Sequence, residues 1–386
     1  MKIALVWNHR SRLLDCSFRF EQYLVGFEAL GHAATVVCDH DSAQGFDGPL
    51  HVVETADQLA TPEVWRATGA EVAVIVTWHR MPEVLQAMQG AGLQVIAVTD
   101  TDGQMGLRTF PRLSLERMLV YQPSPRGRLR VFKYWLTQWI KGIWRTSPED
   151  LELLASTRAS DAVILGSTEA RRNFRRFLHG AGAGGLCDRL HVVPFTIGDA
   201  LLSCPVPEHK RDCIVAIGRW DDPQKDAGLL AAALERFGET RPTTEVAILG
   251  RGGDAWFAGL ERFAPRLRYV GVQQQEQVAH QLAEARSIVF SSRWEGCPHA
   301  ALEALACGAT VIGPAIPSLN SWADEGRFGT VTASRRPRAL ADAMVREMSA
   351  WDAGQRNAQD ISRHWRQVLD PAVVCQAMLQ ALPPRR

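Results

Sequence analysis

The sequence lacks several features that would place the chain in a specialised class. No apolar run reaches the length of a membrane-spanning helix, and none of the eight cysteines forms a Cys-x-x-Cys pair. These absences argue against a membrane-spanning protein, a zinc site and a disulfide scaffold, and the scattered thiols favour the reducing cytosol. The opening residues 1–8 are too short for a signal peptide and are typical of a buried first strand.

The chain also lacks an excess of charge. It carries 43 Lys and Arg against 42 Asp and Glu, a formal net charge of +1, so the molecule as a whole gives no indication of nucleic-acid binding. With 46% hydrophobic and 22% charged residues, the composition is that of a soluble globular protein. A length of 386 residues is enough for two domains with cores of their own.

Short apolar segments alternate with helical stretches along both halves of the chain. The segments that predict strands are 2–6, 34–38, 72–76, 95–98, 162–165, 190–193, 213–217, 245–249, 267–270, 287–290 and 310–312. Strands separated by helices predict parallel, doubly wound sheets in an α/β fold, with ligands outside the carboxyl ends of the strands. The polar, proline-bearing run 203–210 is the predicted linker, so we expect domains at 1–203 and 204–366, followed by a terminal helical segment, 367–386.

The segment 292–308 carries two carboxylates in a strand–turn–helix setting. Glu295 lies in the predicted loop, Glu303 lies eight residues on in a short helix, Pro298 suits the first helical turn and Gly308 suits the helix end. The N–H groups at the start of such a helix can bind an anion or a sugar oxygen, and a carboxylate bonds the hydroxyls of a diol strongly. The same spacing at 63/71 and 276/284 lacks this setting, and the alternative for 295/303 is a plain buried βα unit with a surface glutamate.

Two further turns follow predicted strands of the second half. Gly218 and Arg219 precede Lys225 in a loop that leads into a helix, where two cations could neutralise a diphosphate without a metal ion; the alternative is a solvated basic loop. Gly250 ends the next strand, in a glycine cluster that by itself indicates only a tight turn.

In this order, the motifs resemble those of the family 4 (group 1) retaining glycosyltransferases, which have the GT-B fold of two Rossmann-like domains. The resemblance implies that Glu295 binds sugar hydroxyls, that Glu303 holds the ribose and that Arg219 and Lys225 hold the diphosphate of a nucleotide sugar such as a UDP or GDP sugar. The donor-binding residues that it implies are Gly218, Arg219, Lys225, Gly250, Val270, Val272, Gly296, Cys297, Pro298, His299, Ala300 and Glu303. It implies no cofactor and no metal.

The chain departs from the family where a histidine usually ends a first-domain strand. Asp100 and Asp102 stand there instead, and they either contact the sugar or acceptor or cap a turn. His79 also ends an apolar strand and is either a cleft residue or a structural histidine. With Glu295, these three residues are the catalytic candidates.

The expected activity is therefore sugar transfer to a glycan or lipid-linked acceptor in the synthesis of cell-surface polysaccharide or lipopolysaccharide. The alternatives are a GT-B protein that binds a nucleotide sugar without turnover and a GT-B epimerase of nucleotide sugars.

The segment 128–145 mixes basic and aromatic residues at helical spacing. Leu129, Phe132, Leu136, Trp139, Ile140 and Ile143 fall on one side of the helix. Such a helix either lies on an anionic membrane surface or packs on its own domain. The first alternative predicts a peripheral protein on the cytoplasmic face of the membrane.

Overall fold

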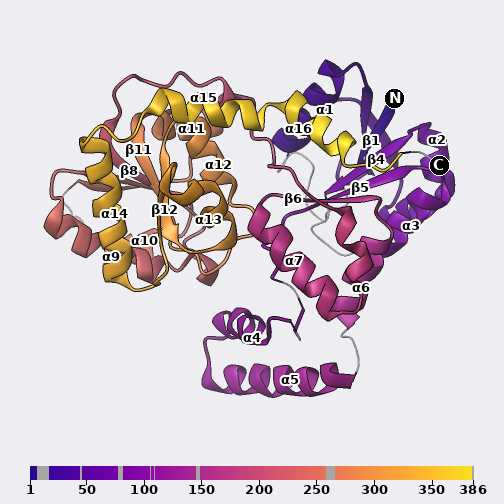
Figure 1. Ribbon diagram of the computed structural model, residues 1–386, viewed down its shortest axis with the longest axis horizontal. Helices are drawn as coiled ribbons and strands as arrows, with labels where there is room; N and C mark the ends of the chain where they lie inside the picture. Colours follow the sequence, from indigo (N-terminus) through magenta and orange to yellow (C-terminus); the bar gives the residue numbers. More distant parts are fainter. Residues whose placement is uncertain are drawn as a thin grey trace. The chain divides into compact units, whose positions relative to one another are not determined.

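The computed structural model describes residues 1–6, 17–43, 46–76, 81–104, 106–107, 109–144, 148–257 and 266–384. It divides into two compact units (Figure 1). Unit 1 contains Met1–Thr196 and Asp370–Arg386, and unit 2 contains Ile197–Leu369. No helix in the described ranges is both long and apolar enough to cross a membrane.

Unit 1 is built on a parallel sheet with the strand order β3-β2-β1-β4-β5-β6-β7. Its elements are β1 (Lys2–Val6), α1 (Ser17–Ala29), β2 (Ala33–Asp39), β3 (Leu50–Val53), η2 (Ala56–Ala60), α2 (Pro62–Thr68), β4 (Val72–Val76), α3 (Pro82–Gly90), β5 (Gln94–Thr99), α4 (Pro111–Val120), α5 (Pro125–Trp144), α6 (Pro148–Arg158), β6 (Ala162–Leu165), α7 (Thr168–Gly180), η3 (Gly184–Arg189), β7 (Leu190–Val192) and α16 (Pro371–Gln380). The central strand β4 is buried along its whole length, as expected for a parallel strand covered on both faces.

Helices cover both faces of this sheet. The large core on one face gathers side chains such as Trp65, Leu85 and Phe174 from η2, α2, α3, α6 and α7. Helices α1 and α16 pack together, and a Cβ at Gly26 would lie 2.3 Å from the carbonyl oxygen of Pro371. Only glycine permits this approach, which joins the end of the chain to α1.

Unit 2 holds a second parallel sheet, with the order β10-β9-β8-β11-β12-β13. Its elements are α8 (Asp199–Leu202), β8 (Arg211–Ile217), η4 (Pro223–Lys225), α9 (Ala227–Thr240), β9 (Glu245–Leu249), α10 (Asp254–Phe257), β10 (Leu267–Gly271), α11 (Gln275–Glu284), β11 (Ala285–Val289), α12 (His299–Ala306), β12 (Thr310–Pro314), α13 (Pro317–Ala323), η6 (Asp324–Gly326), β13 (Gly329–Thr332), α14 (Pro337–Asp352) and α15 (Ala358–Leu369). Helices α9 and α14 pack together over one core, while α11, α12 and α15 form a second helical layer.

The α/β prediction of two doubly wound parallel sheets is confirmed. Each strand expected from the sequence is present, with ends that move by at most two residues. The sequence did not indicate β3 and β13, which lie at sheet edges.

The division between the units lies earlier than the predicted boundary at 203/204. The structure divides the chain after Thr196, and α8 packs on α11 and α12 in unit 2. The predicted linker is also part of unit 2. Its Lys210 is buried and donates to the carbonyl oxygens of Leu282 and Cys307, 3.1 and 2.7 Å away. Similarly, unit 1 resumes at Asp370 rather than at residue 367, and Asp370 caps α16 through the amides of Ala372 and Val373.

Candidate functional site

The carboxyl ends of β8, β9 and β10 meet through glycine backbone in unit 2. Gly250 has φ +107°, and a Cβ there would lie 1.9 Å from the carbonyl oxygen of Gly218, so no larger residue fits. The Gly250 amide donates to the carbonyl of Gly271 at 2.7 Å, and the Tyr269 hydroxyl donates to the Gly250 carbonyl at 2.8 Å. The predicted glycines therefore hold three strand ends together.

Two loops that are far apart in the sequence are joined by hydrogen bonds at this edge of the sheet. The amide of Arg293 donates to the Gln224 carbonyl at 2.8 Å, and the Gln224 carboxamide donates to the Trp294 carbonyl at 2.7 Å. The Ser291 hydroxyl donates to the Lys225 carbonyl at 2.6 Å. The loop after β8 and the loop after β11 thus form one surface.

Lys225 and Glu295 form an ion pair on this surface. The Lys225 Nζ atom lies 2.6 Å from Glu295 Oε1, and the two side chains are only 17% and 9% exposed. The Ser292 hydroxyl donates to the same Oε1 at 2.5 Å, and the Gln224 carboxamide reaches Oε2 at 3.4 Å. The family resemblance implies a diphosphate as the partner of Lys225 and a sugar as the partner of Glu295, but the sequence does not indicate that the two side chains contact each other.

A second charged cluster, also missed, stands behind this pair. Asp226 has φ +51°, and its carboxylate forms ion pairs with the guanidinium groups of Arg335 at 2.6 Å and Arg293 at 3.0 Å. Arg335 also donates to the carbonyl of Ser292 at 2.6 Å. The cluster therefore fixes the backbone on both sides of the Lys225–Glu295 pair. Arg335 lies 109 positions from Asp226 in the chain, so no local sequence pattern indicates this contact.

Arg219 differs from Lys225 because it faces solvent. Its side chain is 57% exposed and pairs with Asp222 at 3.0 Å, three residues on. Exposed pairs of this kind contribute little, so Arg219 can turn to an anion at small cost.

Helix α12 starts at the end of the loop that carries Glu295. Pro298 is its N-cap residue rather than part of the first turn, and His299 is the first helical residue. Gly296 is fixed by the Ser318 hydroxyl, which donates to its carbonyl at 2.7 Å. Cys297 is buried like Pro298, while Ala300 is partly exposed like His299. Helix α12 therefore begins four residues after Glu295, and the free N–H groups of its first turn suit an anion.

Glu303 lies on the same helix, one turn further along. Its side chain is partly exposed, and in the described part of the chain its carboxyl group has no hydrogen-bond partner. Burial raises the pKa of Glu303 from 4.5 to about 7. A partly buried acceptor group without a hydrogen-bond partner is available for a ligand hydroxyl.

The two valines predicted to bind the donor lie at the end of β10 and just after it. Val270 is partly buried, whereas Val272 is 73% exposed. The Gln273 carboxamide donates to the carbonyls of both residues, at 3.2 and 3.0 Å. A base that used these backbone acceptors would have to displace the Gln273 side chain.

The catalytic candidates Asp100 and Asp102 lie in unit 1, where the Asp102 side chain caps a turn. Its carboxylate accepts from the amide of Gln104 at 3.1 Å and forms a buried ion pair with Arg117. Burial raises the pKa of Asp102, and the neighbouring Arg117 opposes that shift. Turn capping is thus observed for Asp102. Sugar or acceptor contact stays a prediction for Asp100 and Asp102, and His79 lies outside the described residues.

No group of three or more His, Cys, Asp or Glu side chains that could hold a metal ion occurs in the described ranges. Metal independence remains a prediction.

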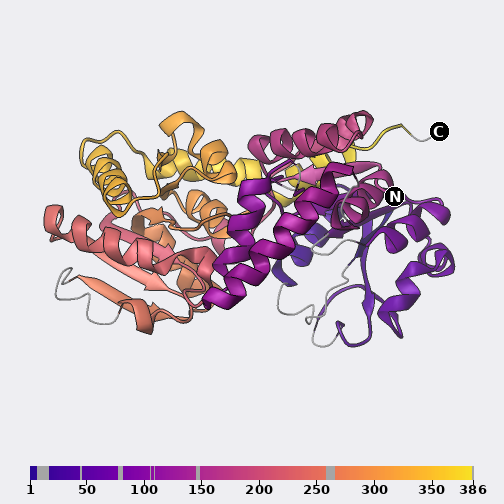
Figure 2. The same cartoon turned by 90° about the horizontal axis from the view of Figure 1, so that it is seen from below.

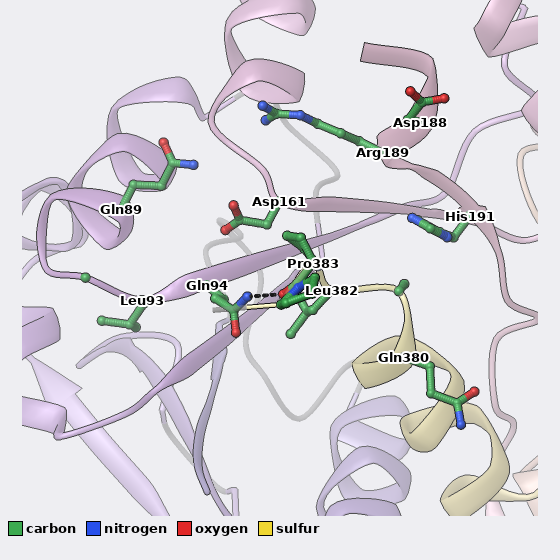
Figure 3. A pocket seen from close by; sticks show the side chains of 13 residues that line it. Gln89, Leu93, Gln94, Asp161, Asp188, Arg189, His191, Gln380, Leu382 and Pro383 are labelled. Carbon is green, nitrogen blue, oxygen red and sulfur yellow. Dashed lines mark hydrogen bonds between the residues drawn. The ribbon is translucent and has the colours of Figure 1, made fainter. Parts of the chain in front are cut away.

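A cavity of about 960 Å³ lies elsewhere, at the amino ends of β5, β6 and β7 in unit 1 (Figure 3). Asp161, Arg189 and His191 line it, together with the residues after α16. The Gln94 carboxamide there donates to the Pro383 carbonyl at 2.8 Å. No predicted site residue lines this cavity, and it opens at the sheet edge opposite to the one where ligands bind in doubly wound folds.

The chain resembles known proteins in part of its sequence and in its fold. Residues 211–349 match the family model described as Glycosyl transferases group 1. A stretch of 144 residues is 28% identical to the D-inositol 3-phosphate glycosyltransferase of Frankia alni, and it spans 33% of this chain and 34% of that protein.

Solved structures resemble the chain over almost its whole length. The apo form of the lipopolysaccharide outer core galactosyltransferase WaaB has a TM-score of 0.63 at 15% identity, with 99% of both chains covered. HepE of Anabaena in complex with UDP has a TM-score of 0.63 at 14% identity, covering 98% of this chain and 99% of HepE. The sucrose-phosphate synthase of Thermosynechococcus elongatus has a TM-score of 0.60 at 16% identity over 98% of both chains. The chain therefore has the GT-B fold, and its residues 211–349 match the family model of the group 1 glycosyltransferases.

Proposed function

We propose that the protein is a retaining, metal-independent glycosyltransferase that moves a sugar from a nucleotide-diphosphate sugar to a glycan or lipid-linked acceptor. The observation that carries this proposal is the buried Lys225–Glu295 pair at the carboxyl ends of the strands of unit 2, followed in the chain by Glu303 on α12. The same edge holds a nucleotide in other doubly wound folds.

Each group has a role that its chemistry suits. Lys225 and the exposed Arg219 neutralise the diphosphate, because charge-assisted bonds to phosphate oxygens are about twice as strong as neutral ones. The carboxylate of Glu295 accepts hydrogen bonds from sugar hydroxyls. Lys225 already orients that carboxylate, so little reorganisation is needed when the donor binds. The carboxylate of Glu303 accepts hydrogen bonds from the two hydroxyls of the ribose.

The reaction breaks the bond between the sugar C1 and the diphosphate oxygen and forms a bond from C1 to the acceptor oxygen on the same face. The leaving diphosphate takes the proton of the acceptor hydroxyl. No protein nucleophile is required, and the contribution of the chain is charge stabilisation and orientation.

A UDP sugar is the first donor to test. HepE was crystallised with UDP and with UDP-glucose, and WaaB is a galactosyltransferase of the lipopolysaccharide outer core. We place the protein in the cytoplasm, in the synthesis of cell-surface polysaccharide or lipopolysaccharide.

The test measures release of UDP from UDP-glucose and UDP-galactose, with EDTA present, by the wild type and by two variants. Glu295→Gln should abolish turnover and leave UDP binding within about threefold, whereas Glu303→Gln should weaken UDP binding itself. Glu276→Gln is the matched control, because Glu276 is exposed on α11 and has the same eight-residue spacing to Glu284. NMR of the new glycosidic linkage determines whether the configuration is retained.

Three outcomes would contradict parts of the proposal. Binding of UDP without any turnover would favour the nucleotide-sugar-binding protein, and a change of sugar configuration within the donor would favour the epimerase. If neither glutamate substitution changed binding or turnover, the site assignment would be wrong.

A further inference from the structure

The connection from β5 to β6 contains a helical hairpin that stands apart from the core of unit 1 (Figure 1) and faces the viewer when the molecule is seen from below (Figure 2). Helices α4 and α5 pack on each other, and the described residues of α5 make extensive contacts with no other element. The Trp135 indole fastens the pair by donating to the Pro111 carbonyl at 3.1 Å. None of the described side chains of either helix is buried.

Helix α5 exposes a continuous apolar face. Leu129, Phe132, Trp139 and Ile140 recur at helical spacing and are 55%, 40%, 37% and 49% exposed. The rings of Phe132 and Trp139 each lie 6.0 Å from that of Trp135, so the aromatic side chains form one stack. Exposed apolar side chains that are contiguous in this way mark an interaction surface. The alternative from the sequence, in which this face packs on its own domain, is not what the described residues show.

The flank of this face is cationic. Helix α5 contains three Arg and two Lys and no acidic residue. Arg126, Arg128, Arg130 and Lys133 are exposed, and none pairs with an acidic side chain of the described chain. A second copy of the protein would set like charges against one another here. A flat anionic surface with an apolar interior matches both the cations and the aromatic face.

The hairpin is rooted at the ligand-binding edge of the unit 1 sheet. Arg117 of α4 forms the buried ion pair with Asp102, three residues after β5 ends. The Asp102 carbonyl accepts from the Asn173 side chain of α7 at 3.1 Å, and a Cβ at Gly103 would lie 2.0 Å from the Ala170 carbonyl oxygen. The loop is therefore fixed to the body of the unit, so the position of the hairpin is coupled to the edge where the acceptor is expected.

We propose that the α4–α5 hairpin is a docking arm that binds an anionic lipid surface and presents the ligand-binding edge of unit 1 to lipid-borne acceptors. The docking surface comprises the face of Leu129, Phe132, Leu136, Trp139 and Ile140 with the flanking Arg126, Arg128, Arg130 and Lys133. Delivery of an acceptor rests on the proposed glycosyl transfer, but binding of the arm to lipid does not.

The experiment measures co-sedimentation with phosphatidylcholine vesicles that contain or lack phosphatidylglycerol. The wild type should bind the anionic vesicles at least tenfold more tightly than the neutral ones and should be released by salt. The apolar variant carries Phe132→Ser, Trp139→Ser and Ile140→Ser, and it leaves Trp135 in place. The charge variant carries Arg128→Gln, Arg130→Gln and Lys133→Gln. Each should lose at least tenfold in affinity for the anionic vesicles.

Trp256→Ser and Arg338→Gln are matched controls, because they remove an exposed tryptophan and an exposed arginine from unit 2. Both should bind as the wild type does. The thermal shift with UDP and the rate of UDP release from a UDP sugar should be unchanged in all the variants. This readout keeps a failure of the docking arm distinct from a failure of the proposed function.

The proposal is overturned if the wild type does not bind anionic vesicles. A protein partner would then be the occupant of the docking surface. The proposal is also overturned if both triple variants bind vesicles as tightly as the wild type while retaining its melting temperature.

Discussion

Glu303 gives the sharpest prediction, because burial of its carboxyl group should affect folding stability and nucleotide binding in opposite directions. Burial raises the pKa of its carboxyl group from 4.5 in the unfolded chain to about 7 in the folded protein. The folded state therefore holds the proton between these pH values more tightly than the unfolded state does. Protonation contributes stability below about pH 4.5, and that contribution is lost as the pH rises through about 7.

The size of the loss follows from the shift. A difference of about 2.5 pKa units corresponds to about 3 kcal/mol, and partial exposure of the side chain reduces this to about 2 kcal/mol. Glu303→Gln removes the titrating group and keeps its shape. We expect the variant to exceed the wild type in free energy of unfolding at pH 8 by about that amount, and to match it near pH 4.5.

Nucleotide binding should respond in the opposite direction. Two ribose hydroxyls need the ionised carboxylate as acceptor, and with a pKa of about 7 about one molecule in eleven is ionised at pH 6 against ten in eleven at pH 8. The Kd for UDP should thus be about tenfold larger at pH 6 than at pH 8, or about 1.4 kcal/mol.

Calorimetric titration with UDP at both pH values measures this ratio, and denaturant unfolding measures stability. Glu303→Gln is the control for titration of the nucleotide itself, and its Kd should be less dependent on pH. A wild type and a variant with the same pH profile for UDP binding, and with the same stability at pH 8, would refute the reasoning.

Two further predictions concern the Lys225–Glu295 pair and the glycine contact at the strand ends. Lys225→Met leaves Glu295 buried without its cation and should lower the free energy of unfolding in urea by about 3 kcal/mol. The double variant Lys225→Met with Glu295→Met should recover most of that stability and remain inactive. A double variant no more stable than the single one would contradict a direct ion pair. Gly250→Ala places a Cβ 1.9 Å from the Gly218 carbonyl oxygen, so it should lower the free energy of unfolding by more than about 3 kcal/mol and abolish UDP binding. Gly354→Ala, at a position with φ +67° and open space, is the control; it should lower that free energy by about 1 kcal/mol and leave UDP binding unchanged. Equal losses of stability in the two variants would show that the strand ends can move apart without cost.

Most of the fold could be predicted from the sequence, because parallel strands buried on both faces appear as short apolar runs. β4 and β12 are buried along their whole length and were predicted directly. β3 and β13 are short edge strands with partly exposed residues, so their sequences carry no comparable run.

The boundary between the units could not be predicted from composition. The run 203–210 is polar and contains prolines, which is typical of a linker. In the structure its backbone carbonyls accept from Gln359 and Arg366, and Lys210 is buried against the ends of α11 and α12. Long-range contacts of this kind decide which unit a segment joins.

The sequence predicts the residue types of the candidate site but not how their side chains pair. Glycines, a cation and carboxylates at strand ends indicated a nucleotide-sugar site in unit 2. Nothing local shows that Lys225 contacts Glu295, 70 residues away, or that the Gln273 side chain donates to the Val270 carbonyl at the end of β10. These contacts depend on how neighbouring strands order themselves in the sheet.

The central claim is that unit 2 binds a nucleoside diphosphate through its own cations and carboxylates. A thermal-shift comparison of UDP, GDP, ADP and CMP, each with and without EDTA, tests it most directly. Ligand at a hundred times its Kd stabilises the folded state by about 2.7 kcal/mol, so the account predicts a clear rise in melting temperature with one nucleoside diphosphate, unchanged by EDTA and lost in Glu303→Gln. No rise with any nucleotide, or a rise that EDTA removes, would contradict it.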